Sequence, residues 1–138
     1  MFMAFNRVLL AILEIMFAIG MIGFWIYFFL VENKNPEKSK EYLSYERSFP
    51  IPDLVWLTPG LIISAIGVLL HQLFGYILTI AVSGGLIFLG LVDISFNIQN
   101  KQYTSNFGDS MMNIFINLAC VILGPIFIIG AAQYIGVV

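Results

Sequence analysis

The stretch that decides the fold is "VLLAILEIMFAIGMIGFWIYFFLV", residues 8–31, in which twenty-three uncharged residues surround one carboxylate, Glu14. A helix needs about 20 mainly apolar residues to cross ~30 Å of hydrocarbon. A secretory signal peptide has a shorter apolar region, of about 7–15 residues, and then a small-residue cleavage site, which this stretch lacks. We therefore expect residues 7–31 to form a retained membrane-spanning helix.

The composition of the whole chain points to the same environment. Hydrophobic residues make up 60% of the 138 residues and charged residues only 10%, against about 25% charged in soluble proteins. The formal net charge of -2 offers no basic surface, so we expect a lipid bilayer and no nucleic acid as partner. The single cysteine, Cys120, excludes an intramolecular disulfide and a CxxC redox pair.

Hydropathy predicts three further spans. They lie at about 54–71, 74–97 and 111–135. The link "HQLFG" between the second and third spans is too short for anything but a tight hairpin, so these two helices are antiparallel neighbours. The expected fold is therefore all-α: a polytopic membrane protein with four transmembrane helices in an antiparallel bundle, forming a single domain over residues 1–138.

Residues 32–53 form the one strongly polar loop of this plan. We expect a short surface helix that starts at Asn35, because Asn is a good N-cap and Pro36 suits the first helical position. The prolines of "FPIPD" predict extended chain after it. Asp53 is then expected to cap the second span, and Asp109 and Ser110 to mark the start of the fourth.

Positive charge is distributed unevenly between the two sides of the membrane. Loops one and three lie on one side and carry five of the six basic residues, namely Lys34, Lys38, Lys40, Arg47 and Lys101. The side that holds the termini has only Arg7. The positive-inside rule therefore predicts that both termini lie outside.

Small and polar residues follow one face of each later span when the chain is wound at about 100° per residue. Such faces allow helices to approach closely in lipid, so we expect them to point inward. In span order, the inward positions are Asp53, Leu57, Gly60, Ser64, Gly67 and His71; Thr79, Leu86, Gly90, Asp93 and Asn97; and Asn113, Asn117, Cys120, Gly124 and Ala131.

The first span differs because its inward face carries Glu14. Exposing this carboxylate to lipid would cost at least ~2.5 kcal/mol, so we expect it to face other helices. Gly20 and Gly23 lie on the opposite side, where a partner helix could pack. Trp25 and Tyr27, near the far end, are expected to anchor the helix in an aromatic belt at the membrane interface.

Two candidate polar sites follow from the depths of these residues. The terminal-side site comprises Glu14, His71 and Gln133; the loop-side site comprises Asp53, Asp93, Asn97, Asn113 and Asn117. One histidine among scattered acids predicts neither a metal site nor bis-histidine haem, and no cofactor is expected. Motifs of hydrolases, metalloproteases and phosphate-binding loops are missing from the sequence, so catalytic residues stay unassigned.

Three functional hypotheses remain from the sequence. The leading one is a non-catalytic membrane subunit or scaffold that packs against a membrane-protein partner or forms a homo-oligomer. The second is a protein that binds a lipophilic ligand, or a membrane isomerase, with inward acids at one end of the bundle. The third is an oligomeric channel or transporter element that uses Glu14 or Asp93. Sequence alone leaves enzymatic activity undecided.

Overall fold

The computed structural model describes residues 5–104 and 106–138, and within them the chain forms helices and no strand. Five are α-helices and three are short 3-10 or π segments. In chain order the elements are α1 (Arg7–Leu30), η1 (Glu32–Lys34), α2 (Lys40–Glu46), η2 (Pro52–Leu57), α3 (Thr58–Leu69), α4 (Leu73–Gln99), η3 (Gln102–Thr104) and α5 (Phe107–Ile135).

Four of these segments are long and apolar enough to cross a membrane: Arg7–Lys34, Pro52–Leu69, Leu73–Gln99 and Phe107–Ile135. Large apolar side chains cover their outer faces; Met16, Phe88 and Phe115, for example, are 62%, 66% and 73% exposed. In water such a surface would aggregate, whereas in lipid it is matched to its surroundings. The fold is that of an integral membrane protein, and the expected four-helix architecture is confirmed.

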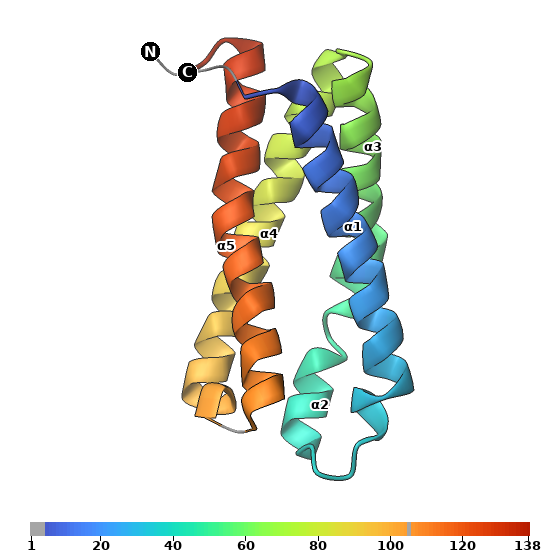
Figure 1. Cartoon of the computed structure of the whole chain (residues 1–138), viewed down its shortest axis with the longest axis vertical. Coiled ribbons are helices and arrows are strands. Elements are labelled where there is room, and N and C mark those ends of the chain that lie inside the picture. Colours follow the sequence, from blue (N-terminus) through green and yellow to red (C-terminus); the bar gives the residue numbers. More distant parts are fainter. Residues whose placement is uncertain (1–4, 105) are drawn as a thin grey trace.

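Each spanning helix packs mainly against the spanning helix that precedes or follows it in the sequence (Figure 1). The extensive helix contacts are those of α1 with α3, α3 with α4, and α4 with α5, while α1 and α5 touch only slightly. The start of α1, the end of α5 and the α3–α4 turn lie at one end of the bundle, and α2 lies with the end of α4 and the start of α5 at the other. This arrangement confirms that loops one and three share a side.

The inward faces expected from the sequence are confirmed where α4 meets α5. A Cβ added at Gly90 would lie 2.7 Å from the Cβ of Cys120, and one at Gly124 would lie 2.5 Å from Cγ1 of Ile87. Both distances are far shorter than ordinary contacts between carbon atoms, ~3.5–4.0 Å. Glycine at these positions is therefore what lets the two longest helices approach each other.

Backbone meets backbone where α3 turns into α4. A Cβ added at Gly75 would lie 2.4 Å from the carbonyl carbon of Gly67. His71 lies in the turn with a φ of 56°, a left-handed conformation that non-glycine residues adopt rarely. Two glycines thus allow the tight hairpin that sets α3 and α4 side by side.

The expected surface helix in the polar loop starts later than the sequence indicated. Its N-cap is Ser39, whose Oγ accepts a hydrogen bond from the backbone N–H of Tyr42 at 3.1 Å. Asn35 instead accepts one from the N–H of Glu37 at 2.9 Å, a local turn that competes with helix. The helix α2 has two faces: Lys40, Glu41 and Ser44 are exposed, as expected of a surface helix, whereas Tyr42 and Glu46 are buried.

The proline segment was also interpreted wrongly. The chain is helical from Pro50, and the backbone N–H of Asp53 donates to the carbonyl of Phe49 at 2.9 Å, so Asp53 lies inside the helix and does not cap it. Pro50 and Pro52 fit because the N–H groups of a first helical turn have no partner within the helix to lose. Further on, the backbone N–H of Thr58 donates to the backbone carbonyl of Asp53, five residues earlier. This longer spacing gives η2 its wider π geometry.

The fourth span likewise begins earlier than the expected residue 111. Asn106 is its N-cap, and its side chain accepts a hydrogen bond from the backbone N–H of Asp109 at 3.3 Å. Asp109 therefore lies in the first helical turn and is not the cap. In the first turn its negative charge interacts favourably with the helix dipole.

Candidate functional site: a cavity between α1 and α5

A cavity of about 320 Å³ lies in the space that α1 and α5 leave between them. Its volume is at the lower end of the ~300–1,000 Å³ range typical of small-molecule sites. Its walls come from α1, α4 and α5 and are mostly apolar, with Leu13, Phe17, Met21, Leu89, Ile116 and Leu123 among the lining residues. Met16 and Phe115, both also exposed on the outer surface, border it, so the cavity opens sideways between the two helices.

Polar residues gather at the loop side of this cavity. Four of the five residues of the loop-side site line it, namely Asp53, Asp93, Asn113 and Asn117. The fifth, Asn97, is fully buried and does not line the cavity; its Nδ2 donates to Oδ2 of Asp93 at 3.3 Å. The structure thus brings the expected loop-side residues together, with Asn97 as a supporting residue of Asp93.

Trp25 belongs to the cavity and not to an aromatic belt. It is 3% exposed, and its Nε1 donates to Oδ2 of Asp53 at 2.9 Å. A buried indole needs an acceptor for its N–H, and Asp53 on η2 supplies one because Trp25 lies on the inward face of α1 that it shares with Glu14. Tyr27, by contrast, points outward and is 41% exposed.

Two acceptor atoms at the polar end have no hydrogen-bond donor within the described residues. Asn117 is 2% exposed, and its Nδ2 donates to the hydroxyl of Tyr103, but its Oδ1 has no partner. Oδ1 of Asp93 is buried without a partner as well. Because buried polar atoms are normally hydrogen-bonded, these two oxygens are unused acceptors, and the buried hydroxyl of Tyr45 beside Asp93 is an unused donor at the same end.

Glu46, on α2, is a lining residue that the sequence analysis missed. Burial, followed by the negative charges of Asp93, Glu32 and Asp53, raises the pKa of its carboxyl to about 8, while Lys38 acts in the opposite direction. The available signal was the spacing of Tyr42, Tyr45 and Phe49, which places aromatic side chains on the face of Glu46.

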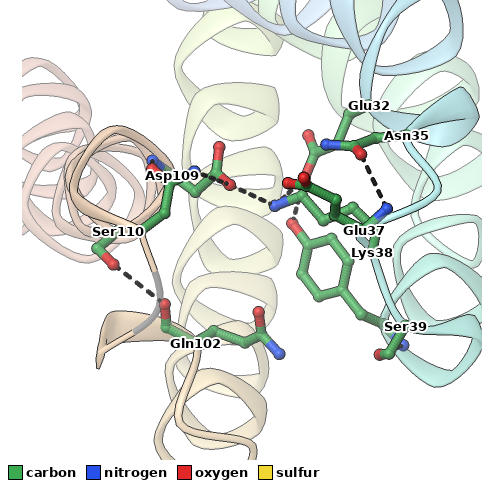
Figure 2. A network of polar contacts seen from close by, with 10 residues as sticks. Glu32, Asn35, Glu37, Lys38, Ser39, Gln102, Asp109 and Ser110 are labelled. Atoms are coloured by element: carbon green, nitrogen blue, oxygen red, sulfur yellow. Dashed lines mark hydrogen bonds and ion pairs between the residues drawn. The ribbon is translucent and has the colours of Figure 1, made fainter.

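A polar network closes the loop side of the gap between α1 and α5 (Figure 2). The Nζ of Lys38 lies 2.7 Å from Oδ2 of Asp109 on α5 and 3.5 Å from Oε1 of Glu32, just after α1. Burial raises the pKa of Tyr42 above its usual range, so its hydroxyl keeps its proton and donates to Glu32 at 2.6 Å. Lys38 thereby joins the loop after α1 to the start of α5.

Contacts at the other end close the gap near the termini. The backbone N–H of Phe5 donates to Oε1 of Gln133 at 2.9 Å, and that of Arg7 donates to the hydroxyl of Tyr134 at 2.8 Å. His71 is exposed, and its Nδ1 lies 2.7 Å from the hydroxyl of Tyr76. The cavity is therefore a lateral opening framed at both ends.

Glu14 lies apart from this cavity, in the interface of α1 with α3 and α4. It is fully buried, which confirms that it faces helices. Its Oε1 accepts hydrogen bonds from Ser64 at 2.9 Å and Thr79 at 2.7 Å. Its donors are thus two hydroxyls and not His71 or Gln133, the other members of the expected terminal-side site. No hydrogen bond among the described residues joins those three residues.

Replacing Glu14 with Met should leave the fold as stable as the wild type within about 1 kcal/mol. The Ser64 and Thr79 hydroxyls also lie within reach of the carbonyls of Leu61 and Gly75, at 3.0 and 2.9 Å, so they keep acceptors when the carboxyl is removed. Glu14→Gln should be the more harmful change, by about 1–3 kcal/mol, because its new NH₂ occupies the place of Oε2, which has no partner among the described residues.

Thermal unfolding of both variants in the same detergent measures the difference. If Glu14→Met fails to assemble while Glu14→Gln behaves as the wild type, the hydrogen bonds that Glu14 accepts from Ser64 and Thr79 are required to hold the helices together.

Among residues 5–104 and 106–138, no group of three His, Cys, Asp or Glu side chains is placed to hold a metal ion. Together, the fold and the cavity define an integral membrane protein of four spanning helices with a laterally open, polar-ended pocket. No protein-family model, curated protein or solved structure matches the chain.

Proposed function

We propose that this protein binds a lipophilic molecule with a single hydrocarbon chain, which enters from the bilayer between α1 and α5. The observation that carries the proposal is the cavity itself: an apolar space whose one polar end holds Asp53, Asp93 and Asn117. Apolar walls favour a hydrocarbon chain, and a few polar groups at one end fix the orientation of a ligand. This is the second of the three hypotheses drawn from the sequence.

The geometry supports the other two hypotheses less well. Gly20, expected to face a partner helix, lines the cavity. Glu14 and Asp93, the two acids expected to pass ions, belong to separate sites, and Glu14 is not a lining residue. A scaffold role would need only an outer surface, so it does not explain the polar-ended cavity.

The polar end of the cavity lies on the side of loops one and three. These loops hold five of the six basic residues of the chain. By the positive-inside rule we place this end of the ligand at the cytoplasmic face.

The test uses Trp25 as a reporter inside the cavity. The chain has two tryptophans, and Trp56 is 51% exposed on the outer surface, so Trp56→Phe leaves Trp25 alone. We expect a long-chain alcohol brominated along its chain to quench Trp25 in a saturable way when it is added to the protein in bilayers of unbrominated lipid. In Trp25→Phe, the outward Trp56 should report only the gradual partition of the alcohol into the bilayer.

Two glycines of α1 give a matched pair of variants. A Cβ added at Gly20 or at Gly23 meets no atom within 4 Å, but only Gly20 lines the cavity. Gly20→Phe should therefore abolish the saturable quenching, and Gly23→Phe should leave it intact, with similar unfolding temperatures. Equal, non-saturable quenching in both variants and in the parent protein would overturn the proposal.

A further inference from the structure

The ionisable side chains that line the cavity are of one sign, apart from the thiol of Cys120. They are Glu46, Asp53 and Asp93, and neither Lys, Arg nor His is among the lining residues. The acids also act on one another, since Asp93 and Asp53 both contribute to the raised pKa of Glu46. Lys38, which opposes this effect, is held by Asp109 and Glu32 outside the cavity. An anionic head group would meet these carboxyls without a cation to pair with.

Two oxygens at the same end of the cavity lack a hydrogen bond within the described residues. Oδ1 of Asn117 and Oδ1 of Asp93 are buried acceptors without donors in the described parts of the chain. Of the donors nearby, Nε1 of Trp25 bonds to Asp53 and Nδ2 of Asn117 bonds to Tyr103. The buried hydroxyl of Tyr45, beside Asp93, and the amide of Asn113, a lining residue, are further donors at this end. A ligand that carries hydrogen-bond donors would pair with these two Oδ1 oxygens.

We propose that the head group of the bound molecule is a protonated amine, so that the ligand is a long-chain cationic amphiphile. An ammonium carries three N–H donors and no acceptor, which suits the Asn117 and Asp93 oxygens and offsets the charge of the acids. A bare metal ion fits less well, because the described residues contain no three-ligand group for one. This inference rests on the proposed function and adds the chemistry of the head group.

The experiment compares three brominated ligands with the same chain and different heads: an amine, an alcohol and a carboxylate. Each is titrated into the Trp56→Phe protein in unbrominated, uncharged lipid near neutral pH, where the amine is protonated, with Trp25 quenching as the readout. We expect the amine to bind at least about tenfold more tightly than the alcohol, because hydrogen bonds from a charged donor are stronger than those from a neutral one; tenfold corresponds to about 1.4 kcal/mol. The carboxylate should bind most weakly.

Asp93→Asn removes one charge with almost no change in shape and should reduce the amine preference about tenfold. Its matched control is Glu41→Gln, which removes a charge at the same end of the molecule from an exposed position on α2 that does not line the cavity. Glu41→Gln should keep the preference in full. If Asp93→Asn does not fold, Asp53→Asn serves in its place, and the comparison of the three heads on the parent protein needs no variant.

The outcomes separate the two proposals. Saturable, Gly20→Phe-sensitive binding of all three ligands with equal affinity, or tightest binding of the carboxylate, would overturn the amine assignment and leave lipophile binding intact. The absence of saturable binding for every head group would overturn both. If Glu41→Gln and Asp93→Asn reduce the amine preference equally, the preference comes from the general surface charge. That result would overturn the proposed site.

Discussion

Replacing Glu46 with Gln should stabilise the protein at about pH 9 by an amount on the order of a few kcal/mol, and change it little at about pH 4. The pKa of Glu46 is raised from 4.5 to about 8 by burial and by the charges of Asp93, Glu32 and Asp53. The folded state therefore holds a proton that the unfolded state releases above pH 4.5. The stability linked to this proton is complete below pH 4.5 and is lost as the pH rises to about 8.

Gln resembles the protonated acid and does not titrate, so the Glu46→Gln protein should lose less stability over this range of pH. Unfolding temperatures measured in one detergent from pH 4 to 9 give the comparison. Glu41→Gln is the control, since Glu41 is exposed on the same short helix. Parallel pH profiles for the wild type and Glu46→Gln would mean that Glu46 is ionised in the folded protein and that water reaches it.

Replacing Gly75 with Ala should disrupt the α3–α4 hairpin. The added methyl group would lie 2.4 Å from the carbonyl carbon of Gly67 and 2.4 Å from the backbone nitrogen of Val68. Backbone atoms cannot turn aside as a side chain can, so the two helices must separate. We expect a loss at or above the upper end of the ~1–3 kcal/mol that overpacking usually costs, measured as the fall in unfolding temperature.

Gly84 provides the matched control on the same helix. It is exposed, and a Cβ added there meets no atom within 4 Å. Gly84→Ala should therefore leave the unfolding temperature unchanged or raise it slightly, because Ala is the better helix former. Equal effects at Gly75 and Gly84 would contradict the close contact of α3 with α4.

The parts of the structure that the sequence predicted well are those set by periodicity. Ser64, Gly90 and Asn117 were placed inward because lipid-facing positions are bulky and apolar, and all three are buried. In a membrane-spanning helix the backbone bonds to itself, so the face on which a residue lies follows from its number alone. The loop-side polar site could be anticipated for the same reason.

The features that the sequence could not predict depend on contacts between residues far apart in the sequence. Glu46 enters the cavity because α2 folds back beneath α4, where Tyr45 stacks on Phe96 with ring centroids 3.6 Å apart. Trp25 turns inward because Asp53 accepts its N–H, and Asp53 is placed by a π segment that simple proline rules do not anticipate. The gap between α1 and α5 is a relation between the first and last helices, which no local pattern encodes.

The contacts of Phe5 with Gln133 and of Arg7 with Tyr134 join residues 128 and 127 positions apart in the sequence. A chain made from its N-terminus forms the α1–α3 and α3–α4 pairs first, since each needs only residues already synthesised. Asn113 and Asn117 lie on α5 and come last. During biogenesis the pocket therefore exists only as an open groove facing lipid, and a hydrocarbon chain lying in that groove would be enclosed as α5 packs. The packing of α5 is therefore the step that completes the pocket, and the lateral opening between α1 and α5 remains after it.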